Sequence, residues 1–118
     1  MSAAVFSLFL VGYSLANAAD NPKVELVDQS CPPGAIRIAV FSQGRVEVNG
    51  REAAVADIPQ KLDQLMKYGS VVCVHREHPE SAEPHPNMIK VLDMVIARKL
   101  PVAFYWDAKF QKRVVFKE

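Results

Sequence analysis

The residues best suited to chemistry form one polar cluster in the second half of the chain. Three histidines and three glutamates fall within eleven residues: His75, Glu77, His78, Glu80, Glu83 and His85. Zinc takes imidazole and carboxylate ligands, so His75, His78 and His85 are candidate metal ligands. Their spacing matches no recognised metal motif, and the prolines of the same segment are typical of a solvated loop. We expect no metal and no other cofactor, and keep a small periplasmic metal-binding protein as the alternative function.

Nucleophilic chemistry has less support. Cys73 lies between Val72 and Val74, where burial disfavours the thiolate that would react. No serine has the context of a nucleophile elbow, and the five glycines form neither a dinucleotide fingerprint nor a phosphate-binding loop. The sequence therefore predicts a protein that is not an enzyme and has no catalytic residues.

The first 18 residues carry no charged side chain, because all 14 Lys and Arg and all 13 Asp and Glu follow them. This apolar segment lacks the usual basic start but ends in Ala16-Asn17-Ala18, the small-x-small pattern of a signal-peptidase site. Spanning a bilayer needs about 20 apolar residues, and Ser14 and Asn17 interrupt the run. We expect a signal peptide over residues 1–18 and a periplasmic location. The alternatives are an uncleaved inner-membrane anchor facing the periplasm and a buried helix.

Net charge and length limit the kinds of partner and the number of domains that the chain is expected to have. The net charge of +1 gives no electrostatic case for nucleic acid or for acidic membranes, and 118 residues suggest one folded domain.

Export would allow Cys31 and Cys73 to form a disulfide. A buried free thiol at Cys73 is the alternative, since sequence alone does not place two Cα atoms at bridging distance.

The domain is organised around an alternating stretch, residues 36–49, which predicts a β-hairpin. Apolar residues recur at every second position on both sides of Ser42-Gln43-Gly44, whose glycine suits a positive φ. Asn49-Gly50 is a second turn signal. Residues 19–35 contain proline and glycine and are predicted as a linker with room for one short strand.

Two helices and further strands follow the hairpin. The first helix is expected to be capped by Asp57, to bury one face and to stop at Gly69. The second is expected to be capped by Asn87 and to end before Pro101, with Ile89 and Ile96 widening its apolar stripe. Residues 70–75 and 102–106 are predicted as strands, the first parallel to the hairpin strand through a right-handed crossover, and 113–116 as a closing strand.

These elements predict an α+β fold: a single mixed sheet with two helices packed on one face, in the order β-β-α-β-α-β plus a closing strand. The expected core is Ile36, Ile38, Val40, Val46, Val48, Leu62, Leu65, Val72, Val74, Val91, Leu92, Val95 and Phe104. The C-terminal strands are apolar and aromatic, so they are predicted to form an open edge for homodimerisation or peptide capture. The candidate partner-binding residues are Tyr105, Trp106, Val114 and Phe116.

Residues 36–106 resemble the periplasmic domain of the ExbD/TolR biopolymer-transport proteins. The resemblance lies in the hairpin ending at Val46–Gly50, the helix with Ile58, Leu62 and Leu65, the strand Val71–Arg76, and the step Val91-Leu92-Asp93 before a closing strand. It implies a dimeric domain near the peptidoglycan that engages partner segments, such as the TonB periplasmic region. Family members look like a transmembrane helix followed by this domain. An aspartate in that helix takes part in proton flow together with ExbB or TolQ. No acidic residue precedes Asp20 here, so the coupling role does not carry over.

Residue pattern and resemblance together predict an exported, non-enzymatic ExbD/TolR-like domain over residues 36–118. Its expected function is to bind a protein or peptide partner by strand addition, in envelope biopolymer transport without proton coupling.

Overall fold

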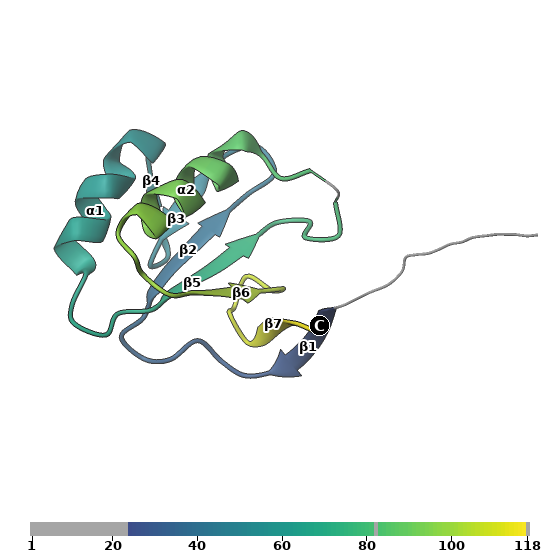
Figure 1. Ribbon diagram of the computed structural model, residues 1–118. Helices are drawn as coiled ribbons and strands as arrows, with labels where there is room; N and C mark the ends of the chain where they lie inside the picture. Colours follow the sequence, from purple (N-terminus) through teal and green to yellow (C-terminus); the bar gives the residue numbers. More distant parts are fainter. Residues whose placement is uncertain (1–23, 82, 118) are drawn as a thin grey trace, which may run out of the picture.

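The computed structural model describes residues 24–81 and 83–117, so the predicted signal peptide and its cleavage site lie outside the described residues. The chain folds into one seven-stranded sheet with two helices (Figure 1). The strands are β1 (Val24–Asp28), β2 (Ile36–Val40), β3 (Val46–Val48), β4 (Arg51–Ala53), β5 (Val72–Arg76), β6 (Val102–Tyr105) and β7 (Lys112–Phe116). The helices are α1 (Ile58–Leu65), which follows the 3₁₀ turn η1 (Val55–Asp57), and α2 (Pro86–Ala97).

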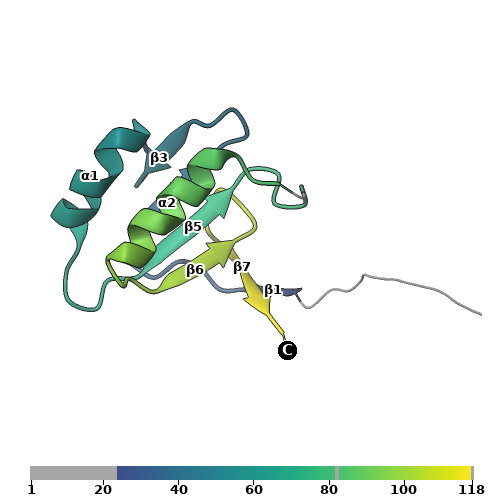
Figure 2. The same cartoon turned by 45° about the horizontal axis from the view of Figure 1, so that its top comes forward.

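The sheet is mixed, in the order β1-β7-β6-β5-β2-β3-β4. Strands β2, β5 and β6 are parallel neighbours joined through α1 and α2, and the other pairs are antiparallel. Both helices cover the same face, as the turned view shows (Figure 2). The predicted fold class is confirmed, including the parallel pairing of β2 with β5.

The main core lies between the helices and that face. Ten of the thirteen expected core residues are buried there, joined by Ile58 and Met88. Leu65 is exposed because it is the last residue of α1, past the buried pair Ile58 and Leu62. Leu92 and Phe104 are only partly buried. Ile89 and Ile96 are exposed, because they lie about a quarter turn from the buried stripe of α2.

The caps of the helices differ from the prediction. Asp57 holds the N-cap position of α1 but its side chain makes no capping bond. For α2 the predicted cap Asn87 is wrong, and the cap is His85, whose Nδ1 accepts a hydrogen bond from the Asn87 backbone N–H at 3.0 Å. Pro86 stands at the first helical position, which suits proline and leaves the preceding residue as the cap. The Asn87 side chain instead donates to the Gly44 carbonyl at 2.8 Å.

A second, smaller apolar cluster covers part of the opposite face of the sheet. Segment 29–35 and the turn 107–111 pack there, and Cys31 forms a disulfide with Cys73 of β5, with Cα atoms 6.2 Å apart. The Cys31 N–H also donates to the Phe110 carbonyl at 2.9 Å. Of the two alternatives for the cysteines, the structure has the disulfide rather than a free thiol at Cys73.

The predicted linker contains a strand of the sheet. Residues 24–28 form β1, which pairs along its whole length with β7. The predicted C-terminal edge is therefore wrong: Val114 pairs with Phe104 on one side and with Leu26 on the other. A short alternating segment carries no local signal for which distant strand it will join, so the sequence pattern did not reveal this pairing.

Candidate functional site

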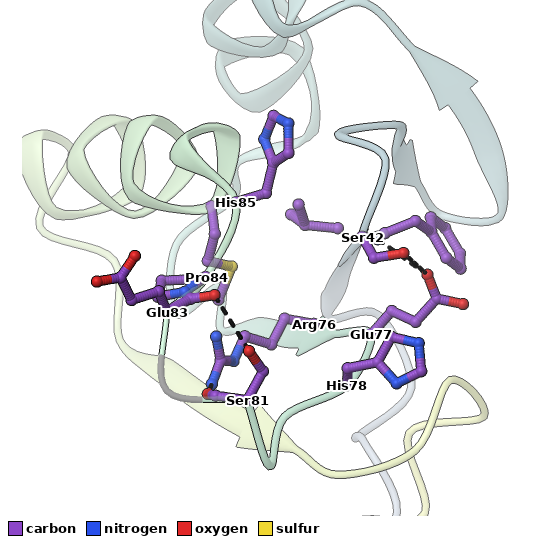
Figure 3. Close-up of a pocket in the computed structure, with 11 residues that line it drawn as sticks. Ser42, Arg76, Glu77, His78, Ser81, Glu83, Pro84 and His85 are labelled. Atoms are coloured by element: carbon purple, nitrogen blue, oxygen red, sulfur yellow. Dashed lines mark hydrogen bonds between the residues drawn. The ribbon is translucent and has the colours of Figure 1, made fainter.

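A pocket of about 310 Å³ opens where β2 and β5 end (Figure 3). The two strands are parallel, so the residues that follow them, Ser42 and Glu77, meet at one end of the sheet. Ser81, Glu83, Pro84 and His85, with Met88 of α2, close the other side. Most of the polar cluster singled out from the sequence lines this pocket.

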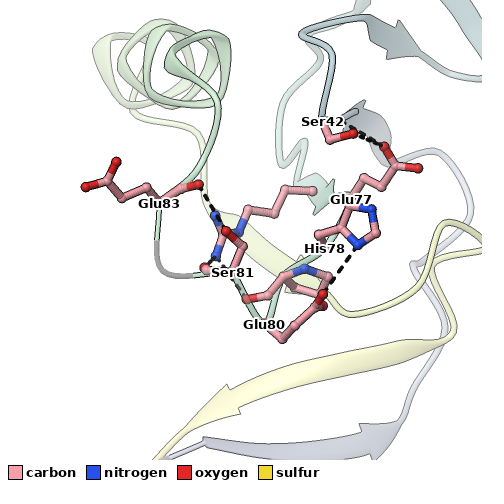
Figure 4. Close-up of polar contacts among 8 residues, drawn as sticks. Ser42, Glu77, His78, Glu80, Ser81 and Glu83 are labelled. Carbon is pink, nitrogen blue, oxygen red and sulfur yellow. Dashed lines mark hydrogen bonds and ion pairs between the residues drawn. The ribbon is translucent and has the colours of Figure 1, made fainter.

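The three histidines nevertheless do not converge. His75 is buried on the disulfide side of the sheet, with Nδ1 3.1 Å from the Tyr105 carbonyl. His78 is exposed and lies 3.3 Å from Glu80 (Figure 4). His85 uses its Nδ1 to cap α2. Within residues 24–81 and 83–117, no group of three possible ligands is placed to hold a metal ion.

Glu77 joins the ends of β2 and β5. Its Oε1 accepts hydrogen bonds from the backbone N–H and from the hydroxyl of Ser42, both at 2.9 Å (Figure 4). These bonds, the backbone one first, lower the pKa of Glu77 below its ordinary value. A carboxylate with a lowered pKa is a weak general base. The Ser42–Glu77 pair therefore fits a structural role, in which it links the ends of β2 and β5, better than an acid–base or nucleophilic role.

Arg76 organises the loop that forms the pocket floor. Its Nη2 donates to the Pro79 carbonyl at 2.9 Å and also to the Ser81 carbonyl (Figure 3). Both acceptors are neutral, and none of the ion pairs among the described residues includes Arg76. Nothing in the sequence pattern singles out this arginine, since a single cation after an apolar strand forms no motif.

Gly44 allows the hairpin to approach α2. Its φ is +96°, the positive value that the predicted turn needed. A Cβ built there would lie 2.6 Å from Cε1 of His85, so the position has no room for a side chain. The β2–β3 turn and the cap of α2 are thus packed on one another beside the pocket, which His85 lines.

The two edges of the sheet offer a different kind of site. Strand β4 has three residues, and Arg51 and Glu52 are exposed on it. Strand β1 has five residues, and the apolar Val24 and Leu26 are exposed on it together with Glu25 and Asp28. Short, charged edges resist pairing with another chain, whereas longer apolar edges favour it. Among the described strands, β1 is the edge suited to a partner.

No strand in the part of the chain that the structure describes pairs with the outer side of the β1 backbone. The Gln29 N–H donates to the Gln111 carbonyl at 3.1 Å, just beyond the paired part of β1 and β7. Antiparallel residues turn alternately toward and away from their neighbour. It follows that Val24, Leu26 and Asp28 point their N–H and C=O groups away from β7, toward the open edge.

The candidate partner-binding residues from the sequence are distributed differently from the prediction. Tyr105 is 3% exposed and packs edge-on against Phe110, so it is not available to a partner. Val114 is paired on both sides. Trp106 and Phe116 are exposed, at 39% and 64%. The alternation of Val24 and Leu26 with Glu25 was the signal that could have directed attention to β1.

Comparison with known proteins leaves the family assignment as a prediction: no family model, no curated protein and no solved structure matches the chain. Among the helices of the described residues, none is long and apolar enough to cross a membrane.

Proposed function

We propose that this chain is an exported, non-enzymatic domain, similar to the periplasmic domain of ExbD/TolR proteins, that binds a protein partner by adding a strand beside β1. The observation that carries the proposal is the position of β1 at the edge of the sheet, where it pairs with no other described strand on its outer side and exposes Val24 and Leu26. The proposed context is biopolymer transport at the cell envelope, without the proton coupling that the family's membrane aspartate provides.

Strand addition needs an edge that stays in place while a partner binds. The backbone pairing of β1 with β7 is accompanied by two exposed ion pairs, Lys112 with Asp28 and Lys117, just after β7, with Glu25 at 3.6 Å. The disulfide at Cys31 fixes the chain three residues after β1. With its inner side paired and its end tethered, β1 presents the outer groups of Val24 and Leu26 in a preformed row, which reduces the ordering cost of binding.

The polar pocket supports a non-enzymatic role. The Glu77 carboxylate is held by Ser42, and the rings of His78 and His85 make separate local contacts. A nucleophile, a base and a group that orients the base would have to lie in one hydrogen-bonded chain. The described residues of this pocket form no such chain.

A second copy of the chain is one partner that this edge fits. An antiparallel pairing of two β1 strands centred on Leu26 would place Glu25 of each copy opposite Val27 of the other, and so would bring no like charges into register. It would also extend the sheet through a two-fold axis, as symmetric dimers do.

Hydrogen exchange of backbone amides tests the proposal directly. In the free monomer, the outward amides of Leu26 and Asp28 should exchange fast, while those of Glu25 and Val27, which bond to β7, should be protected. Added partner peptide, or a rise in protein concentration if the partner is a second copy, should protect Leu26 and Asp28. A chain that sediments as a monomer at all concentrations, and whose β1 amides respond to no peptide from neighbouring envelope proteins, would rule the proposal out.

Leu26→Pro sharpens the same test. Proline at this position removes an outward donor but no bond to β7, so binding should fall at least tenfold while the fold remains. Leu26→Ala is the matched control, because it removes the side chain and keeps the N–H. If both variants bind equally well, the edge is not the site.

A further inference from the structure

The helix-covered face of the sheet is left open at one side. Helices α1 and α2 lie over β2, β3 and β5, whereas β7 and β1 extend beyond them (Figure 2). The step between α2 and these outer strands forms a groove of about 360 Å³. Its walls are mainly apolar and include Val74, Leu92, Phe104, Val114 and Phe116.

Register explains why these side chains share one face. Phe104 stands opposite Val114, and Phe116 opposite Val24, so alternate residues of three strands point into the groove. The rings of Phe104 and Phe116 meet edge to face, with centroids 5.9 Å apart. Phe116 is 64% exposed, which leaves a large apolar surface in contact with solvent.

The groove is polar at one end only. Among the described residues that line it, Arg76 is the one with a charge, and Trp106 lies at the same end, where β5 and β6 finish. The hydrogen bonds that Arg76 makes among the described residues both come from Nη2 and go to carbonyls. Among the described residues these two bonds leave Nε and Nη1 without an acceptor, and a guanidinium pairs well with a carboxylate.

We propose that this groove binds a long-chain carboxylic acid, with its carboxylate on Arg76 and its hydrocarbon chain along Phe104, Val114 and Phe116. The lining matches the ligand in polarity: one cation at one end, and apolar side chains along the rest. The volume lies within the range of small-molecule sites.

Two other occupants fit less well. Strands β6 and β7 are paired on both sides, so an extended peptide in the groove would find no free strand edge for its own N–H and C=O groups. An amphipathic helix could lay one face in the groove, but it would need an acidic side chain placed to reach Arg76, whereas a fatty acid carries its carboxylate at the end of its chain. A hydrocarbon chain has no polar groups to satisfy and is narrow enough.

Trp106 makes the proposal easy to test, because it is the only tryptophan of the chain and lines the groove. Titrating the protein with dodecanoate, below its micelle concentration, should shift Trp106 emission to the blue and saturate. Decanoate should bind roughly 15-fold more weakly, since each buried methylene contributes about a factor of four. Dodecanol, which has the same chain but no charge, should bind at least tenfold more weakly than dodecanoate.

Variants distinguish the contribution of the ligand's carboxylate to binding from that of its hydrocarbon chain. Arg76→Gln should abolish the preference for the acid over the alcohol, and Arg51→Gln, the same charge loss on the distant strand β4, should leave it unchanged. Phe116→Ser, at an exposed position, should weaken both ligands without unfolding the protein. Should Arg76→Gln fail to fold, Phe116→Ser and the acid–alcohol comparison still decide the matter.

The groove lies on the face of the sheet, whereas strand addition uses the outer backbone groups of β1, so dodecanoate should leave the exchange of the Leu26 and Asp28 amides unchanged although Val24 borders both sites. No saturable change in Trp106 emission would overturn the proposal as a whole. Equal affinity for dodecanol and dodecanoate would overturn the assignment of Arg76.

Discussion

The sheet has two halves that are built in different ways. In the half formed by β2, β3 and β5, residues such as Ile38 and Val74 are completely buried under the helices. In the half formed by β7 and β1, Leu26 and Phe116 are apolar and yet exposed. A covered half of this kind stabilises the fold, whereas an exposed apolar half on a stable support is what a binding surface requires. The difference places stability and recognition in separate parts of a small domain.

The disulfide connects the two halves, and its loss should have the largest effect. Cys31 and Cys73 are 42 residues apart, and closing a loop of that length stabilises a fold by about 4 kcal/mol in the chain-entropy model. Replacing both cysteines by alanine should lower the free energy of unfolding by about that amount in urea denaturation. Amides of β1 should then exchange faster than those of β2. A uniform rise in exchange, or a loss below about 1 kcal/mol, would mean that the disulfide does not hold the β1 half in place.

Helix α1 has one buried and one exposed leucine, which together test the packing of the covered half of the sheet. Leu62 is completely buried and Leu65, three residues later, is 37% exposed. Leu62→Ala should cost roughly 2 to 5 kcal/mol of unfolding free energy, because it leaves a cavity, and Leu65→Ala less than about 1 kcal/mol. Chemical denaturation measures both. Equal losses would show that α1 is turned differently on the sheet.

Gly44 tests the packing of the hairpin on α2. Gly44→Ala should cost about 2 to 3 kcal/mol, since it adds strain at a positive φ and displaces the His85 cap. Gly69→Ala is the control: its φ is also positive, at +81°, but nothing lies within 4 Å of the added Cβ, so only the strain of about 1 kcal/mol applies. A thermal melt of both variants gives the comparison. Similar losses would mean that His85 moves aside without cost.

The smallest expected effect is the pH dependence due to Glu77. Its pKa is lowered in the folded chain by the hydrogen bonds from Ser42, so the unfolded chain binds the proton more readily. The resulting stabilisation is present at neutral pH and is lost as the pH falls below the ordinary carboxyl range toward the lowered pKa. Asp63 and Asp107, whose pKa values are also lowered, add to the same acid loss.

Glu77→Gln should therefore reduce the difference in unfolding free energy between pH 7 and pH 3, measured by urea denaturation. Ser42→Ala removes the same hydroxyl bond from the other side and should act in the same direction. An unchanged pH profile in Glu77→Gln would show that the hydrogen bonds between Ser42 and Glu77 contribute nothing to stability.

The local patterns of the sequence determined the covered half. Alternation over residues 36–49 fixes which face of the hairpin is buried, and the spacing of Ile58 and Leu62 fixes the inner face of α1. Both are properties of the periods of strands and helices, which residues close in sequence express by themselves. Pro86 likewise contains the signal for the His85 cap, although Asn87 is the better capping residue by type.

The half of the sheet formed by β7 and β1 was decided only by the tertiary structure. The pairing of β1 with β7 joins residues more than 80 positions apart, and the disulfide needs two Cα atoms brought to 6.2 Å. The groove arises because the helices do not cover β7, and the histidines separate because His75 lies within β5, His78 in the loop after it and His85 at the cap of α2. None of these contacts has a local period in the sequence, because each depends on where distant segments meet once the chain has folded.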